Sequence, residues 1–169
     1  MEENEKKEIY FILSQNFKKS TVVSIDTNTV VKKIEKLEEK SIEDDKVYLM
    51  FRRKVKDGKV NEYYAIPGGG KEENETIEEC VAREIKEEFN LDIEVLELLG
   101  TVEDEKNIGY IYNTKLLGGE FKLSGEELDR NTPDNYYEVR KVDIKDIDNI
   151  ELFEENKEMI RKAYQTKKN

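Results

Sequence analysis

The sequence predicts an α/β or α+β domain in which helices cover a mixed β-sheet. Strand-like segments both precede and follow one strong helical segment, a pattern typical of mixed architectures. Charged residues make up 41% of the 169 residues and apolar ones 36%, but the apolar residues gather in short β-rich runs rather than thinning out evenly. Because no repeat, low-complexity tract or Pro/Gly/Ser-rich linker divides the chain, we expect a single domain over residues 1–169.

The first part of the chain is expected to form an N-terminal extension of about residues 1–45. Residues 8–14 (EIYFILS) and 21–25 (TVVSI) are rich in β-branched and aromatic residues and predict two strands. Between residues 27 and 40, apolar residues recur at helical spacing, namely Val30, Val31, Ile34 and Leu37. This spacing predicts a charged amphipathic helix.

A β-hairpin is predicted after the extension. Residues 47–53 (VYLMFRR) have the strongest strand pattern in the first half of the chain, and residues 62–66 (EYYAI) predict a returning strand. Asp57 and Gly58 lie between them and form a dipeptide typical of a tight turn. Residues 67–70 (PGGG) then predict a glycine-rich loop.

Residues 76–89 have the strongest helical pattern of the chain. Thr76 and Glu79 have the spacing of a capping box at the start of this helix. Asn90 follows the last turn, where a residue that tolerates positive φ is favoured. Both ends of the helix are therefore predicted.

The second half of the chain is predicted to return to strands. Strands are expected at residues 93–101, 109–117 and 137–144, and a helix at residues 153–164. Gly118-Gly119 predicts a turn, and residues 124–135 (SGEELDRNTPDN) have the composition of a loop without a steady period.

The composition excludes several kinds of chemistry. The chain has no histidine, which excludes Ser-His-Asp and Cys-His catalysis and histidine-ligated zinc. Cys80 is the only cysteine, so no disulfide can form within the chain. The net charge of −11 disfavours DNA or long RNA as a partner, although a small phosphorylated molecule can bind where a cation reverses the local charge. No membrane span or signal peptide is predicted, so we expect a cytoplasmic protein.

Acidic residues of the predicted helix point toward its apolar side. At about 100° per residue, one apolar arc is defined by Ile77, Cys80, Val81 and Ile85. Glu84 and Glu88 project inside this arc, and Glu87 lies at its edge. An unpaired buried charge costs several kcal/mol, so such a group of carboxylates requires cations.

A divalent cation would supply that charge. Glu84, Glu87 and Glu88 have i, i+3 and i+4 spacing, which brings three carboxylates within reach of one or two ions. Ligation by oxygen alone favours Mg²⁺ or Mn²⁺ over zinc. The backbone at residues 68–70 can approach an ion or a phosphate closely because no side chain intervenes. The glycines and the acidic helix therefore predict a site for a metal–pyrophosphate complex.

These residues resemble the signature of the Nudix (MutT-like) hydrolase family, G-x5-E-x7-R-E-U-x-E-E-x-G-U, in which U is a bulky aliphatic residue. Five residues separate Gly69 from Glu75, and seven separate Glu75 from the run that begins at Arg83 and ends at Leu91 (REIKEEFNL). Asn90 stands where the family has glycine, and asparagine is the commonest other residue in the left-handed conformation that a helix end often requires.

The resemblance implies the Nudix α/β/α sandwich with a mixed sheet, and a bound Mg²⁺ or Mn²⁺. The positions that match the family's metal ligands are Gly69, through its carbonyl group, Glu84, Glu87 and Glu88. Arg83 and Glu75 match a pair that braces the loop against the helix, and an ordinary surface ion pair is the alternative.

The resemblance also implies a glutamate that activates water beside Arg83. Glu84 is our first choice for this base because it belongs to the signature. Glu127, in the acidic loop 125–130, is the second choice, with a solvated loop acid as its alternative.

Residues outside the signature are candidates for contact with substrate. Gly68 precedes the signature, and Arg52 and Arg53 end a predicted strand, where alternation allows only one arginine to point at the site. Two tyrosine pairs have two interpretations, stacking on a base or packing in the core: Tyr63 with Tyr64, and Tyr136 with Tyr137.

The family's reaction is hydrolysis of a pyrophosphate bond in a nucleoside diphosphate linked to another group. From the resemblance, the leading expectation is a nucleoside triphosphate pyrophosphatase, including oxidised nucleotides. The alternatives are an ADP-ribose or dinucleotide pyrophosphatase, and a non-catalytic domain that binds a nucleotide. A small nucleotide is the expected partner, and a homodimer is compatible with the family.

Overall fold

The computed structural model describes residues 6–14, 46–103 and 107–165. The predicted strand at residues 21–25 and the predicted helix at 27–40 lie outside these ranges, whereas the strand predicted at 8–14 is present as β1 (Lys6–Ser14). Within the same ranges, no helix has the length and hydropathy needed to cross a membrane.

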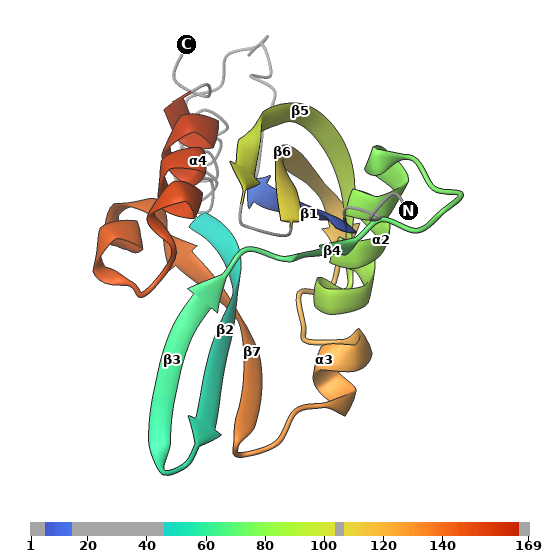
Figure 1. The fold of residues 1–169 in the computed structure, drawn as a ribbon. Helices are drawn as coiled ribbons and strands as arrows, with labels where there is room; N and C mark the ends of the chain where they lie inside the picture. The colour runs from blue at the N-terminus through green and yellow to red at the C-terminus, as the bar shows by residue number, and fades with distance from the viewer. Residues whose placement is uncertain (1–5, 15–45, 104–106, 166–169) are drawn as a thin grey trace, which may run out of the picture.

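The strands form two sheets (Figure 1). The first has the order β4-β1-β6-β5, with β4 at Gly68–Gly70, β6 at Asn107–Gly119 and β5 at Leu91–Glu103. It is mixed as predicted, because β1 is parallel to β6 while the other neighbours are antiparallel. The second sheet, which the sequence did not predict, has the antiparallel order β3-β2-β7, with β3 at Lys59–Ala65, β2 at Lys46–Lys56 and β7 at Asn135–Asp143.

The two long helices lie on opposite sides of the mixed sheet (Figure 1). They are α2 (Ile77–Phe89) and α4 (Glu154–Gln165), and the short elements are α3 (Gly125–Asp129) and the 3-10 helix η1 (Ile144–Asn149). Each long helix packs into its own hydrophobic core. This layered arrangement agrees with the predicted α/β/α sandwich.

Strand β2 contributes to both cores. Val47 and Leu49 pack in the core of α4, whereas Tyr48 and Met50 pack in the core of α2. Successive side chains of a strand point to opposite faces, so a strand between two cores is apolar at every position. This explains why residues 47–51 are all buried and show no alternation.

The predicted ends of α2 are confirmed. The Thr76 hydroxyl accepts a hydrogen bond of 3.2 Å from the Glu79 backbone N–H, and the Thr76 backbone N–H donates one of 2.7 Å to the Glu79 carboxylate. Asn90 has the left-handed conformation, with φ of 55° and ψ of 35°. The β2–β3 turn is also confirmed, because Asp57 and Gly58 both have positive φ.

Two glycine predictions were wrong. Residues 68–70 are not a loop but the short strand β4, which pairs with β1. Gly118 and Gly119 are not a turn but the end of β6, opposite Asp92 and Leu91. Gly119 has a φ of 102°, and a β-carbon there would lie 2.5 Å from the Asn90 carbonyl oxygen. This glycine therefore permits close passage beside the end of α2.

One loop prediction was also wrong, since Gly125–Asp129 forms the one-turn helix α3 within the predicted loop 124–135. A helix of this length shows no apolar period, which is why its sequence resembles a loop. The other strands predicted within the described ranges and the C-terminal helix are present, with ends within three residues of the predicted ones.

Candidate active site

Helix α2 turns two of its glutamates inward and one outward. The Glu84 side chain is 12% exposed, whereas that of Glu87 is 55% exposed. Glu88 is partly buried and its carboxylate accepts a 3.3 Å hydrogen bond from the Gly68 backbone N–H. Glu84 and Glu88 therefore share the inner face, as the apolar arc predicted, and Glu87 lies outside it.

Strand β4 lies directly against these acids. A β-carbon at Gly69 would overlap the Glu84 carboxyl group, so a residue with a side chain would displace one of the two. Glycine at this position allows the backbone to reach the carboxylates. The short strand is thus held between β1 and the inner face of α2.

Arg83 connects the glycine strand, the start of the helix and two of the acids. Its guanidinium donates to both carboxylate oxygens of Glu75, at 3.0 Å and 2.7 Å. It also donates to the Gly70 carbonyl oxygen at 3.1 Å, to Glu84 at 2.7 Å and to Glu87 at 3.4 Å. The hydrogen bond from Arg83 lowers the pKa of Glu75 to about 2. Such two-pronged charged contacts fix geometry strongly, so Arg83 forms a rigid brace.

Helix α3 brings a further acid to the same place. The Ser124 backbone N–H donates to the Glu88 carbonyl oxygen at 3.1 Å, and its hydroxyl donates to the Glu87 carbonyl oxygen. Gly125, with a φ of 65°, passes so close to α2 that a β-carbon would lie 2.7 Å from that same Glu87 oxygen. This close packing places Glu127 beside Glu88.

Burial and nearby negative charges raise the pKa of both Glu84 and Glu88. Burial raises the pKa of Glu88 to about 9, and the negative charges of Glu127 and Glu84 add to the rise. Burial likewise raises the pKa of Glu84, while its hydrogen bond to Arg83 opposes the rise. Carboxylates that lie together with little solvent around them favour a proton or a metal cation between them.

The donor set fits a divalent cation in chemistry and charge, because the candidate ligands on the inner face of α2, the carboxylates of Glu84 and Glu88, are oxygen donors. Within the described ranges, however, no three carboxylates converge closely enough to form a complete metal-binding group. Arg83 holds Glu87 on the outer side of the helix. Ligation by Glu84, Glu87 and Glu88 together would therefore require the Glu87 side chain to rotate away from Arg83.

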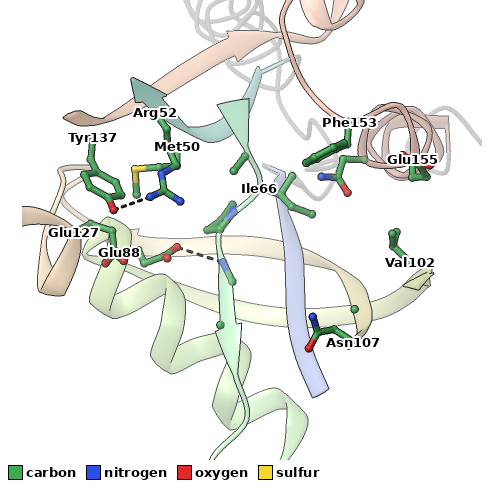
Figure 2. A pocket seen from close by; sticks show the side chains of 16 residues that line it. Met50, Arg52, Ile66, Glu88, Val102, Asn107, Glu127, Tyr137, Phe153 and Glu155 are labelled. Atoms are coloured by element: carbon green, nitrogen blue, oxygen red, sulfur yellow. Dashed lines mark hydrogen bonds between the residues drawn. The ribbon is translucent and has the colours of Figure 1, made fainter. Parts of the chain in front are cut away.

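A pocket of about 510 Å³ opens beside this acidic face (Figure 2). At one end, Glu88 and Glu127 lie opposite Arg52 and Tyr137 (Figure 2). The other end is lined by the start of α4 and the residue before it, namely Phe153, Glu155 and Asn156. Among the described residues that line the pocket, Arg52 carries the only positive charge.

The two candidate arginines point in opposite directions, as strand alternation requires. Arg52 lines the pocket. Arg53 donates a 2.8 Å hydrogen bond to the Pro133 carbonyl oxygen and pairs with Glu62 at 3.5 Å, outside the pocket. The structure therefore brings Arg52 to the acids and leaves Arg53 at the surface.

Several pocket residues were not predicted as such. Met50 and Asn156 carry no sequence signal for a site, because only the folded chain brings them together. Phe153 is 73% exposed beside the pocket, and an isolated aromatic residue before an acidic helix start was the available signal. Tyr137 had two interpretations, and it is buried with its hydroxyl bonded to Arg52.

Comparisons with known proteins all lead to one protein family. A family model described as NUDIX domain matches residues 41–163. Over 91 residues the chain is 35% identical to an ADP-ribose pyrophosphatase of Methanocaldococcus jannaschii, an alignment that covers 50% of this chain and 53% of the relative. The chain thus spans about half the length of the curated relative that it matches.

Two solved structures show a similar fold over nearly the whole chain. A MutT protein from Methanosarcina mazei Go1 has a TM-score of 0.61 at 18% identity and covers 100% of this chain and 99% of its own. A NUDIX-family hydrolase from Clostridium perfringens has a TM-score of 0.60 at 16% identity and covers 96% of this chain and 98% of its own.

Proposed function

The chain belongs to the Nudix family, and from that premise we propose that it is a hydrolase that cleaves the pyrophosphate bond of a nucleoside diphosphate joined to a sugar, as in ADP-ribose. The observation that supports this most directly is the pocket in which Arg52 faces Glu88 and Glu127. One wall suits a phosphate and the other suits a cation and a base. The products would be a nucleoside monophosphate and a sugar phosphate.

We propose that Glu84, Glu88 and the Gly69 carbonyl group hold Mg²⁺ or Mn²⁺, with Glu87 after it leaves Arg83. When bound, such a cation neutralises the pyrophosphate and makes the attacking water more acidic. Arg52 would hold a phosphate oxygen on the opposite side of the pocket. Arg83 and Glu75 would keep the glycine strand against the helix, and Gly68 would offer its backbone to the phosphates.

For the base we now favour Glu127, the second choice from the sequence, over Glu84. Glu127 lines the pocket, whereas Glu84 is absent from its lining and is bonded to Arg83 at 2.7 Å. Glu127 would take a proton from water as the water oxygen attacks phosphorus and the bridging P–O bond breaks. Gly125 at the start of α3 lies close against the Glu87 backbone of α2, which would hold Glu127 beside the pocket.

The far end of the pocket supports a sugar or base as the second moiety. The described residues there supply an exposed aromatic ring, a carboxylate and an amide, from Phe153, Glu155 and Asn156. These groups suit a flat ring and hydroxyl groups, whereas a further phosphate would meet the negative charge of Glu155. The relative named ADP-ribose pyrophosphatase adds support. Nucleoside triphosphates, the leading expectation from the sequence, are the main competing substrates.

A substrate panel tests this proposal. ADP-ribose, other nucleoside diphosphate sugars, and nucleoside triphosphates with their oxidised forms are incubated with enzyme and Mg²⁺, and the products are identified by chromatography. We expect kcat/KM at least tenfold higher for a nucleoside diphosphate sugar than for any triphosphate. The reverse order would favour the triphosphate function, and binding of nucleotides without turnover would favour the non-catalytic alternative. The cytoplasmic location, the homodimer, the single domain and the exclusion of DNA stay predictions.

A further inference from the structure

Tyr137 lies where β7, β2 and the end of α3 meet, and it connects the two walls of the pocket. Its side chain lines the pocket although the residue is only 7% exposed. Figure 2 shows its hydroxyl beside the Arg52 guanidinium, with Glu127 and Glu88 nearby. A buried tyrosine hydroxyl normally has a hydrogen-bond partner, and here the partner is the cation of the pocket.

The Tyr137 side chain fixes the direction of Arg52. Arg52 and Tyr137 are directly opposite each other on β2 and β7. The Arg52 guanidinium donates a 2.7 Å hydrogen bond to the phenol oxygen, and its central carbon lies 4.5 Å from the ring centroid. The Asn135 side-chain amide donates a further, 3.4 Å bond to the same oxygen. One ring thus holds Arg52 by a hydrogen bond and a cation–π contact.

Apart from Tyr137, Arg52 has one longer ring contact, with its central carbon 5.8 Å from the Tyr63 ring centroid. Its Nε is buried without a hydrogen-bond partner among the described residues, and the phenol oxygen is the only acceptor that we find for its guanidinium there. Glu88 and Glu127 lie across the pocket, and a free guanidinium would be drawn into an ion pair with them. Tyr137 therefore keeps Arg52 available for a phosphate.

The peptide group of Tyr137 fixes α3. The Asn131 side chain donates a 3.0 Å hydrogen bond to the Tyr137 carbonyl oxygen and accepts one of 3.1 Å from the Tyr137 N–H. Asn131 follows α3 immediately after its last turn, where its own N–H donates to the Leu128 carbonyl oxygen at 3.2 Å. A helix as short as α3 is unstable alone, so its position depends on such anchors.

We propose that Tyr137 is a positioning residue: its hydroxyl directs Arg52 at the phosphates, and its peptide group, through Asn131, holds the helix that carries Glu127. One residue would thereby set the separation between the Arg52 guanidinium and the Glu127 carboxylate. This inference rests on the proposed function, because it assigns Arg52 to the phosphates and Glu127 to the water.

The chain offers a matched control. Tyr136 is the neighbouring residue on β7 and lies opposite Arg53, as Tyr137 lies opposite Arg52. Tyr136 is 37% exposed and packs against Phe51 on the face away from the pocket, with ring centroids 6.5 Å apart. Tyr137→Phe and Tyr136→Phe therefore remove the same atom from two neighbouring cross-strand pairs, and only one pair belongs to the pocket.

The first experiment measures KM and kcat for ADP-ribose with saturating Mg²⁺. We expect Tyr137→Phe to raise KM roughly 5- to 30-fold, the effect of losing one hydrogen bond to a charged group, with kcat changed less than threefold. Tyr136→Phe should leave both constants unchanged. Equal constants for Tyr137→Phe and the wild type would overturn the inference.

A double-mutant cycle separates positioning from direct contact with substrate. If the hydroxyl acts through Arg52, adding Tyr137→Phe to Arg52→Ala should raise KM no further. Additive effects would mean that the hydroxyl binds substrate itself, which would overturn the assignment. The same cycle with Asn131→Ala and Glu127→Gln is read on kcat. If Asn131→Ala still lowers kcat in the Glu127→Gln background, Asn131 does not act through Glu127, and the second half of the proposal is refuted.

A readout without turnover distinguishes failure of this inference from failure of the proposed function. Binding of ADP is measured by calorimetry for the wild type, Tyr137→Phe and Tyr136→Phe. A wild type that hydrolyses no substrate in the panel would refute the proposed function alone. Weaker ADP binding by Tyr137→Phe, with unchanged binding by Tyr136→Phe, supports the positioning role in either case. Unchanged binding by both variants would refute it.

Discussion

The two walls of the pocket are held in place very differently. Most of the acidic wall comes from one short stretch, residues 69–91, in which Arg83 alone makes contacts with Glu75, Gly70, Glu84 and Glu87, and α3 adds Glu127. The cationic wall joins β2 to β7 across 85 positions of sequence, and besides the strand pairing its side-chain contacts are the Arg52 hydrogen bond to Tyr137 and the approach of Arg52 to the Tyr137 and Tyr63 rings. The acidic wall is thus held mainly by contacts within one stretch of sequence, whereas the cationic wall depends on contacts between strands that are distant in sequence.

Removal of divalent cations should have the largest effect, because it acts on the acidic wall directly. We expect exhaustive EDTA treatment to abolish hydrolysis of every substrate, and Mg²⁺ or Mn²⁺ to restore it. The measurement is initial rate before and after dialysis against the chelator. Full activity in the treated enzyme would mean that the clustered acids serve another purpose.

Substitution of the two candidate bases should have the next largest effect. Glu127→Gln should lower kcat by roughly 10²–10⁴-fold, the range typical of a lost general base, with the apparent affinity for Mg²⁺ nearly intact. Glu84→Gln, in contrast, should lower the apparent affinity for Mg²⁺. The test is kcat as a function of magnesium concentration for both variants. A small kcat loss for Glu127→Gln together with a large one for Glu84→Gln would identify Glu84, on α2, as the base.

The cationic wall should show a sharp difference between adjacent arginines. Arg52→Ala should raise KM for ADP-ribose roughly 10- to 100-fold, as expected when a desolvated charged contact is lost. Arg53→Ala should change KM less than twofold, because Arg53 bonds only to surface groups outside the pocket. Similar KM values for the two variants would place the phosphate elsewhere.

On the acidic wall, two neighbouring glutamates should differ in their effect on stability. The raised pKa of Glu88, about 9, means that this carboxyl group must take up a proton when the metal-free protein folds at pH 7, a cost that Glu88→Gln removes, so the variant should melt at a higher temperature. Glu87→Gln removes an exposed charge paired with Arg83 and should leave the melting temperature nearly unchanged. Calorimetric scans in EDTA check both. A lower melting temperature for Glu88→Gln would show that the carboxyl group of Glu88 stabilises the fold.

The smallest effect is expected for Tyr137→Phe on the chemical modification of Cys80, which lies beneath the acidic wall. Burial raises the pKa of this thiol to about 12, with help from the negative charge of Glu75. Iodoacetamide at pH 9 should therefore modify it in denatured protein and not in the native protein. Tyr137→Phe should not change the rate of Cys80 modification, because weakening the contacts of Arg52 on the cationic wall should not expose residues beneath the acidic wall. Faster modification in that variant would show that the walls are coupled.

The contrast between the walls also explains what the sequence could reveal. The acidic wall is local, so helical spacing and caps were enough to place Glu84, Glu88 and Asn90 correctly. Strand alternation limited the choice to Arg52 or Arg53, but only the pairing of β2 with β7 decides between them. Helix α3 was missed because five residues show no period, and residues 68–70 became a strand only because β1 pairs with them.

The two-sided burial of β2 also has a consequence for errors in folding. Arg52 follows Met50 on the same face, and Arg53 follows Phe51 on the other. A slip of the strand by one position would exchange the two arginines and would also send Tyr48 and Leu49 into the wrong cores. Misregistered molecules would thus lose the packing of both cores and the Arg52 side chain in the pocket. A misregistered fraction of refolded protein should therefore be both inactive and loosely packed.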